Sequence, residues 1–396
     1  MNSKKCRICR KGLKRILSLG KISLVGEFPK SKKNLKKFKI SLNFCEKCKH
    51  VQISELINPN KLFKNYFWET GISTTNLKLI NDIIKKLKKY KINKKSKVFE
   101  IACNDGSFLN SLQKKIGCFS VGIDPAKNLS KKNKSNKVIR LIDYFNKKKS
   151  NKIKKKYGEF DFVFARNVLA HVKDPNTIFS GVKNIMSTAG VFIIEAPSLL
   201  NILKFNQYDN VFHEHIGFHS LKSVIDLSNL NGLKVINVEK IDSQGGSLRY
   251  FLTSNDNNVS VSKNIDAFLK NETKNKLFSN KKLLNFKIKI NNHRKTLLNF
   301  LKKLKENGKK ISVYGASGKG QALMQYCDIG NEVIDFCFDK SKLKQNRFTP
   351  GTNIKILDPV LIEKLPVNYL LLLSWNLKKE IFKQQKNFVN KGGRFI

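Results

Sequence analysis

Four cysteines near the start of the chain are paired at the spacing of a metal site. Cys6 and Cys9 form one C-x-x-C pair, and Cys45 and Cys48 form a second. Two such pairs can place four thiolates on one tetrahedral Zn²⁺, at about 2.3 Å per Zn–S bond. The alternative, four unrelated buried thiols, is disfavoured by the paired spacing. We expect a structural zinc, because four cysteine ligands leave no open position, and a β-rich knob over 10–44 that the metal holds together.

A loop between an expected strand and an expected helix carries groups that suit a nucleotide-type cofactor. The strand 97–101 leads through Ala102-Cys103-Asn104-Asp105-Gly106 into a helix, and a second strand ends at Asp124, where an acid can accept hydrogen bonds from ribose hydroxyls. The loop lacks the G-x-G-x-x-G of dinucleotide sites, and Glu100 is unfavourable for a pyrophosphate. Glu100 suits the sulfonium and amino groups of S-adenosylmethionine (SAM). We favour a methyl donor over NAD and over a structural α/β domain.

Histidines are rare in this chain, and four of the six are His171, His213, His215 and His219. His171 follows an expected strand, at the edge where open α/β sheets bind ligands. A histidine beside a carboxylate, such as Glu214, can be held in one tautomer and act as a general base. A metal site is disfavoured because no known ligand spacing is present, and a structural hydrogen-bonded loop remains open. We favour a loop that contains a catalytic base.

The elements that would position these residues alternate between helices and short apolar strands from about residue 71. This alternation predicts an α/β fold with parallel sheets. In the central part we expect a helix over 77–90 and strands over 97–101, 119–124, 160–165 and 190–196. In the last third we expect a helix over 281–308 and strands over 310–314, 332–339 and 368–374.

A glycine-rich turn, Gly315-Ala316-Ser317-Gly318-Lys319-Gly320, follows the strand 310–314. It differs from a P-loop because Lys319 is followed by glycine and the G-x-x-x-x-G-K spacing is absent, so an ATPase is disfavoured. Two interpretations stay open. The turn could present backbone N–H groups to a diphosphate, or it could be a tight turn in a packing domain.

Length and composition limit the number of domains and the class of protein. A chain of 396 residues is long enough for two or three domains, and 40% hydrophobic residues exclude a wholly disordered chain. No apolar run approaches 18 residues, and no secretory signal is apparent, so we expect a cytoplasmic protein without a membrane partner. The net charge of +49 favours anionic ligands, but only 9 of the 78 basic residues are Arg and the Lys are spread throughout. We therefore favour a codon-driven surface over a nucleic-acid-binding face.

Separated motifs in the same order resemble the three-domain C-methyltransferases that act on nucleotide-linked deoxysugars. The resemblance covers essentially the whole chain. The N-terminal motifs are the two cysteine pairs, 17–20, 27–29 and 49–52. The central motifs are 100–106, 167–171, 212–215 and 243–249, and the C-terminal motifs are 314–320, 349–352 and 374–376.

The resemblance implies an architecture and a cofactor site. It implies a zinc-binding domain over 1–60, a Rossmann-like SAM-dependent methyltransferase domain over 61–240, and a C-terminal Rossmann-like α/β substrate-binding domain over 241–396. Structural Zn²⁺ and SAM are the implied cofactors. The residues implied to bind SAM are Glu100, Ala102, Asn104, Gly106, Asp124 and Asn167.

The resemblance also implies a reaction. The substrate would be a nucleotide-linked, dTDP-type keto-deoxysugar, and a base would remove the proton on C3, next to the C4 ketone. The enolate would then take the methyl group. By its match to the family loop, His215 is the base, Glu214 orients neighbouring groups or the sugar, and His171 holds the enolate oxygen or a hydroxyl. Tyr66 matches an active-site tyrosine.

One position departs from the family pattern, which has a tyrosine where this chain has Phe212. Either Tyr66 or Tyr208 supplies the missing hydroxyl, or the substrate differs. The alternative functions are a SAM-dependent methyltransferase of nucleic acid or of another small molecule, and a non-catalytic zinc-containing adaptor. We expect a monomer or a weak homo-oligomer.

Overall fold

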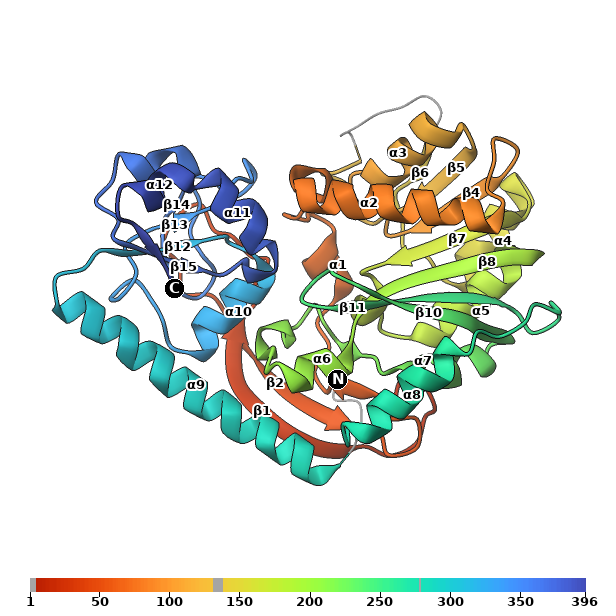
Figure 1. Ribbon diagram of the computed structural model, residues 1–396, viewed down its shortest axis with the longest axis horizontal. Helices are drawn as coiled ribbons and strands as arrows, with labels where there is room; N and C mark the ends of the chain where they lie inside the picture. Colours follow the sequence, from red (N-terminus) through yellow and green to blue (C-terminus); the bar gives the residue numbers. More distant parts are fainter. Residues whose placement is uncertain (1–4, 131–137, 278) are drawn as a thin grey trace. The chain divides into compact units, whose positions relative to one another are not determined.

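The computed structural model describes residues 5–130, 138–277 and 279–396 (Figure 1). Over these residues the chain forms two compact units, each assembled from segments that are far apart in the sequence. Unit 1 comprises 1–15, 43–204 and 216–279, and unit 2 comprises 16–42, 205–215 and 280–396, apart from the undescribed positions. The three contiguous domains expected from the sequence stay a prediction.

Unit 1 is built on a seven-stranded sheet with the order β10-β11-β8-β7-β4-β5-β6. All strands run parallel except β11, which pairs antiparallel with both β8 and β10. The order reverses between β4 and β7, because β4 is followed by β5 on one side and has β7 on the other. The bounds are β4 Lys97–Ile101, β5 Phe119–Ile123, β6 Val138–Leu141, β7 Phe160–Arg166, β8 Met186–Pro197, β10 Leu233–Ile241 and β11 Ser247–Ser254.

Helices cover both faces of this sheet, as a doubly wound fold requires. Buried residues of α2 and α3 pack with Val98, Phe162 and Ile193 on one face. Buried residues of α4, α5 and α7 pack with their strand neighbours, such as Phe99 and Val163, on the other. The bounds are α2 Thr74–Leu87, α3 Ser107–Ile116, α4 Lys147–Tyr157, α5 Pro175–Ile185 and α7 Leu221–Asn229.

Shorter elements complete unit 1. A two-residue strand, β9, pairs antiparallel with β3, so that Val51 lies opposite Phe218 and Gln52 opposite Gly217. The remaining bounds are β3 Val51–Ile53, β9 Gly217–Phe218, α1 Pro59–Phe63, α6 Leu199–Lys204, α8 Asn264–Lys274, and the 3-10 turns η1 Thr70–Ile72, η2 Lys88–Tyr90 and η3 Leu169–His171.

Unit 2 carries a second, all-parallel sheet with the order β14-β13-β12-β15-β16. Its order also reverses, here between β12 and β15. The strands are β12 Ile311–Tyr314, β13 Cys337–Phe338, β14 Ile356–Leu357, β15 Tyr369–Leu372 and β16 Arg394–Phe395. The helices and turns are α9 Asn280–Glu306, α10 Gly318–Tyr326, α11 Lys378–Gln384, α12 Lys386–Asn390, η4 Tyr208–Asn210, η5 Pro359–Glu363 and η6 Trp375–Leu377.

The segment between the cysteine pairs does not form the separate knob expected from the sequence. It forms two long strands, β1 Lys14–Ser23 and β2 Lys37–Phe44, and residues 16–42 belong to unit 2. There, Ser23 N donates to Gln325 Oε1 at 2.7 Å, and Phe348 N donates to Pro29 O at 2.9 Å. Residues 16–42 are therefore linked to the C-terminal part of the chain within unit 2.

Two further expectations need correction. The helix expected over 77–90 begins earlier, at Thr74, because Ser73 Oγ caps it by accepting from Asn76 N. The strand expected over 332–339 is reduced to Cys337–Phe338. The first residues of the expected strand form a turn instead, in which Ile334 N donates to Gly330 O at 3.0 Å.

The predicted α/β class is confirmed in both units. In the part of the chain that the structure describes, no helix is both long enough and apolar enough to cross a bilayer.

Candidate functional site

The expected cofactor loop lies at the carboxyl ends of β4 and β7, where the strand order of unit 1 reverses. Open α/β sheets bind ligands at this point. The loop uses left-handed backbone at Ala102 (φ 56°), Asn104 (φ 50°) and Gly106 (φ 80°), and Asn167, just after β7, is also left-handed (φ 53°). Left-handed conformations are costly for residues other than glycine and cluster at ligand sites. The structure therefore brings together the loop residues and Asn167.

Asp124 closes the loop from the end of β5. Its Oδ2 accepts from Asn104 N at 2.8 Å, and its Oδ1 accepts from Ala126 N at 2.8 Å. Burial raises the pKa of Asp124, and these two backbone donors oppose the shift. The carboxylate therefore fixes the loop's shape, and each oxygen keeps a second lone pair with which a hydroxyl donor can bond.

The Asn104 side chain makes hydrogen bonds within the protein. Its Oδ1 accepts from Thr70 N at 2.9 Å and from Thr70 Oγ1 at 3.1 Å, and its Nδ2 donates to Trp68 O at 3.1 Å. Next to it, Asp105 Oδ2 accepts from Gly71 N at 2.8 Å. Asn104 and Asp105 thus hold the segment 68–71 against the loop by hydrogen bonds.

Glu100 is the group that best tests the fit of SAM. It is 3% exposed, and its Oε2 finds no hydrogen-bond partner among the described residues. Burial raises the pKa of Glu100 to about 8, and Arg166 is the main group that lowers it. A buried acceptor without a partner is costly, and a cationic donor would relieve that cost. The residues at this site therefore fit the cationic methionyl end of SAM.

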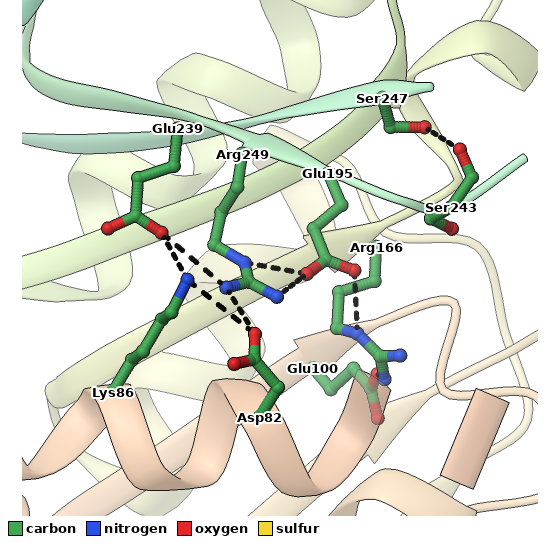
Figure 2. Close-up of polar contacts among 9 residues, drawn as sticks. All are labelled: Asp82, Lys86, Glu100, Arg166, Glu195, Glu239, Ser243, Ser247 and Arg249. Atoms are coloured by element: carbon green, nitrogen blue, oxygen red, sulfur yellow. Dashed lines mark hydrogen bonds and ion pairs between the residues drawn. The ribbon is translucent and has the colours of Figure 1, made fainter. Parts of the chain in front are cut away.

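Glu100 is the inner end of a row of buried charges that crosses four neighbouring strands (Figure 2). Arg166 Nη1 lies 3.5 Å from Glu100 Oε1, and Arg166 Nε donates to Glu195 Oε2 at 3.2 Å. Glu195 Oε1 accepts from Arg249 Nε at 2.7 Å and pairs with its Nη2 at 2.7 Å. At the outer end, Arg249 Nη1 lies 3.2 Å from Asp82 of α2.

Two expected catalytic residues of unit 1 are close together. The ring of Phe63, at the end of α1, lies edge-on to both, at 5.6 Å from the His171 ring and 5.9 Å from the Tyr66 ring. Tyr66 N donates to Asn128 Oδ1 at 2.9 Å. His171 ends η3, directly after the loop that follows β7.

The other two expected catalytic residues belong to unit 2. His215 Nδ1 lies 2.9 Å from the backbone oxygen of Asn210, and the Phe212 ring stacks on the imidazole at 4.2 Å. Glu214 is buried, and its Oε1 lies 3.0 Å from the position that a Cβ on Gly26 would take. Gly26 therefore leaves room for the Glu214 carboxylate.

Tyr208 does not replace the hydroxyl that Phe212 lacks. Tyr208 is 2% exposed, and its hydroxyl lies 2.8 Å from His293 Nδ1 and 3.2 Å from Cys327 Sγ. These contacts occupy the hydroxyl inside unit 2.

The glycine-rich turn of unit 2 is explained by close packing. A Cβ on Gly315 would lie 2.1 Å from Ser374 Oγ, and one on Gly320 would lie 2.5 Å from Leu373 Cβ. At Gly318 the neighbour is the Phe212 ring, at 3.4 Å. Of the two interpretations of this turn, the structure favours the packing one.

The four N-terminal cysteines converge as expected for a metal site. Their Sγ atoms all lie within 4.8 Å of one another, and the Cys6–Cys48 and Cys9–Cys45 pairs are both at 3.4 Å. A tetrahedral Zn²⁺ with bonds of about 2.3 Å needs sulfurs about 3.8 Å apart, which this cluster meets with small shifts.

Comparison with known proteins finds matches along nearly the whole chain. Family models match in order: a "Putative zinc binding domain" over 6–63, a "Methyltransferase domain" over 74–238 and a "C-methyltransferase C-terminal domain" over 242–396. The protein named C-methyltransferase NovU, from Streptomyces niveus, is 29% identical over 362 residues, which cover 91% of this chain and 86% of the relative.

The three domain matches, in this order, identify a SAM-dependent C-methyltransferase. The prediction of a SAM-dependent enzyme with an N-terminal zinc-binding domain is confirmed by these matches.

Solved methyltransferase structures are similar to part of this C-methyltransferase. Magnesium protoporphyrin IX methyltransferase from Synechocystis PCC 6803, with bound SAH, is 13% identical, covers 45% of this chain and 82% of its own, and has a TM-score of 0.35. Mycolic acid cyclopropane synthase CmaA1, complexed with SAH and CTAB, is 11% identical, covers 50% and 91%, and has a TM-score of 0.36.

Sequence reasoning missed several polar residues of this C-methyltransferase. Arg166, Glu195 and Arg249 each stand within or at the end of an apolar strand, which was a usable signal. Lys319, on α10, is 6% exposed, and burial lowers its pKa to about 8 against the opposing charge of Asp209. Asp209 also accepts from Trp375 Nε1 at 2.8 Å.

Proposed function

We propose that this C-methyltransferase acts on a nucleotide-linked, dTDP-type keto-deoxysugar, and that it methylates C3 next to a C4 ketone. The motif resemblance along the whole chain supports this substrate class. The ketone makes the neighbouring C–H acidic enough for a protein base. When bound, SAM supplies the methyl group, and the electron pair of the broken S–CH3 bond stays on sulfur.

The observation that carries the proposal is the hydrogen bond between His215 Nδ1 and Asn210 O at 2.9 Å. A carbonyl oxygen can only accept, so Nδ1 carries the hydrogen and the basic lone pair of the neutral ring is on Nε2. The Phe212 ring packs against the imidazole and limits its rotation. His215 Nε2 is then the base that takes the C3 proton, and the electron pair of the C–H bond enters the enolate.

The remaining catalytic residues assist this step. Glu214, buried beside Gly26, orients the sugar or its neighbours, and His171 holds the enolate oxygen or a sugar hydroxyl. Tyr66, beside the same phenylalanine as His171, is the remaining candidate for the hydroxyl that Phe212 lacks, since Tyr208 is engaged elsewhere. Lys319 is a buried cation that unit 2 can offer to an anionic substrate.

The cofactor is held at the reversal point of the unit 1 sheet. Glu100 binds the α-ammonium group of SAM, and Asp124 accepts from the ribose hydroxyls. The backbone of Ala102, Asn104 and Gly106 shapes the loop. Asn167 is half-buried and left-handed, and its buried Oδ1 has no hydrogen-bond partner among the described residues, so that oxygen can accept from a donor on the cofactor.

The test is transfer of a labelled methyl group from SAM to a dTDP-4-keto-6-deoxysugar, with His215→Asn as the variant. Loss of a general base costs about 10²–10⁴-fold in rate. The variant should also lose exchange of the C3 hydrogen with deuterium from the solvent in the absence of SAM. His213→Asn, in the same loop but without an assigned role, is the matched control, with melting temperatures recorded for both.

Two results would overturn the proposal. One is methyl transfer by His215→Asn at a rate within threefold of the unmodified enzyme. The other is incorporation of the methyl group into RNA or DNA but not into the nucleotide sugar, which would establish the alternative substrate class.

A further inference from the structure

The buried row of charges differs in its pairing between the Arg249 end and the Glu100 end (Figure 2). Arg249 is 0% exposed and contacts Glu195, Asp82 and Glu239 at 2.7 to 3.7 Å. At the inner end, Glu100 Oε2 has no hydrogen-bond partner, and Arg166 Nη2 is given no partner by the residues that the structure describes. One oxygen of Glu100 and one nitrogen of Arg166 are therefore left over, on two side chains whose other atoms, Oε1 and Nη1, lie 3.5 Å apart.

The row is poorly explained as a device for stability. Buried ion pairs lose much of their Coulomb attraction to desolvation, and apolar residues of similar volume often replace them without loss. The same face of the sheet is in fact apolar one step earlier on each strand, with Val98, Phe162, Phe164, Ile193 and Phe251. The charges begin only at the carboxyl ends, where a ligand binds.

The Arg166 side chain is fixed in a defined orientation. Its guanidinium carbon lies 4.7 Å from the centre of the Phe108 ring, and its Nε is held by Glu195 Oε2. The Arg166 side chain is 10% exposed, so it is at the edge of the buried row. Stacking, the ion pair of Nε with Glu195 and the longer contact of Nη1 with Glu100 leave Nη2 for another acceptor. A carboxylate is the acceptor that matches a guanidinium best.

The two unpaired atoms match the two charged groups of an α-amino acid. An α-ammonium and an α-carboxylate are attached to one carbon, so the groups that bind them must be neighbours. Glu100 and Arg166 are such neighbours, at 3.5 Å between Oε1 and Nη1. We propose that Arg166 binds the α-carboxylate of the methionyl part of SAM, and that Glu195 and Arg249 are positioning residues that hold its guanidinium. This inference rests on the placement of the ammonium at Glu100 under the proposed function.

The experiment compares binding of SAM with binding of decarboxylated SAM, which keeps the ammonium and lacks the carboxylate. Affinities are measured by calorimetry for the unmodified enzyme, Arg166→Met and Glu195→Gln. A hydrogen bond to a charged group corresponds to about a 10- to 100-fold difference in affinity. The unmodified enzyme should prefer SAM by that factor, Arg166→Met should bind both forms equally, and Glu195→Gln should show a smaller preference than the unmodified enzyme.

Retained binding of decarboxylated SAM by Arg166→Met shows that the site is folded. Arg166→Lys, which keeps the charge but loses the planar fork, decides the question should the methionine variant fail to fold. Arg166→Lys should lose most of the preference for SAM over decarboxylated SAM. A preference that survives in the variants, or equal affinity of the unmodified enzyme for both forms, overturns this inference alone. An unmodified enzyme that binds neither form overturns the proposed cofactor site as well.

Discussion

The pH dependence of cofactor binding is a direct test of the role of Glu100. Burial raises the pKa of this carboxyl to about 8, with Arg166 opposing the shift and Asp105, Asp124 and Glu195 adding to it. At pH 7 about 90% of the ligand-free chains therefore carry a protonated Glu100. An α-ammonium group binds the ionised form, so binding should release a proton.

The magnitude follows from the fraction of ionised Glu100. Binding should release about 0.9 proton at pH 7 and about 0.5 proton at pH 8. The ionised fraction is about 50% at pH 8, about 9% at pH 7 and about 1% at pH 6, so the affinity should rise roughly 50-fold from pH 6 to pH 8. The sign is fixed because Glu100 is an acid whose ionised form is the one that binds: affinity falls as the pH falls below 8.

The assay is calorimetric titration of S-adenosylhomocysteine at pH 6, 7 and 8, in buffers with different ionisation enthalpies, which counts the protons released. The matched variant is Glu100→Gln, which cannot titrate. The matched ligand is 5′-methylthioadenosine, which lacks the ammonium. Proton release that is the same in Glu100→Gln as in the unmodified enzyme, or the same for both ligands, would refute the reasoning.

Three further outcomes can be measured by unfolding. Arg249→Met should lower the free energy of unfolding in urea by about 3–5 kcal/mol, because it leaves Glu195 buried without its main partner. The double variant with Glu195→Met should recover most of the loss. A double variant as unstable as the single one would contradict this. Gly315→Ala should cost more than about 2 kcal/mol, since φ is +96° and Ser374 Oγ lies 2.1 Å from the new Cβ. The control Gly20→Ala, with φ +84° and no atom within 4 Å, should cost only about 1 kcal/mol, so equal losses would argue against the packing account of Gly315. Elemental analysis should find one zinc per chain, and chelation should lower Tm; an unchanged melting curve after complete zinc removal would show that the cluster contributes nothing to stability.

The sequence predicted the strand, turn and helix around residues 97–116 well because the signal is local. A strand, a loop with Gly106, a helix and an acid after the next strand are all readable within about thirty residues. The cysteine pairs were predicted for the same reason, since a C-x-x-C spacing defines each half of the cluster. Both predictions rest on short-range patterns that tertiary packing did not override.

The charged row could not be predicted, because its contacts join residues far apart in the chain. Glu195 is 29 residues from Arg166 and 54 residues from Arg249. Only the sheet order, with β11 inserted between β8 and β10, makes them neighbours. A charged residue in each of four apolar strands was visible, but pairing needs the register of the sheet.

The segment over 10–44 is β-rich as predicted, but its grouping with unit 2 could not be predicted, for a related reason. A segment between two metal knuckles is expected to fold around the metal when it has no other core. Here, residues 16–42 group with a part of the chain about 300 residues away, through contacts such as the hydrogen bond of Ser23 with Gln325. A single sequence carries no signal for such a long-range exchange.

The zinc knuckle is also a backbone anchor for the chain around two candidate catalytic histidines. Arg7, between the first two cysteines, is 4% exposed and donates to Ile216 O at 2.5 Å and to Ile53 O at 2.6 Å. Ile216 follows His215, and its N–H donates at 2.7 Å to the oxygen of Ala170, the residue before His171. A chain truncated before residue 61 would lose the Arg7 donors and leave β9 without its partner strand. The N-terminal segment therefore helps to hold the backbone beside the candidate catalytic histidines, and its removal should disturb that backbone.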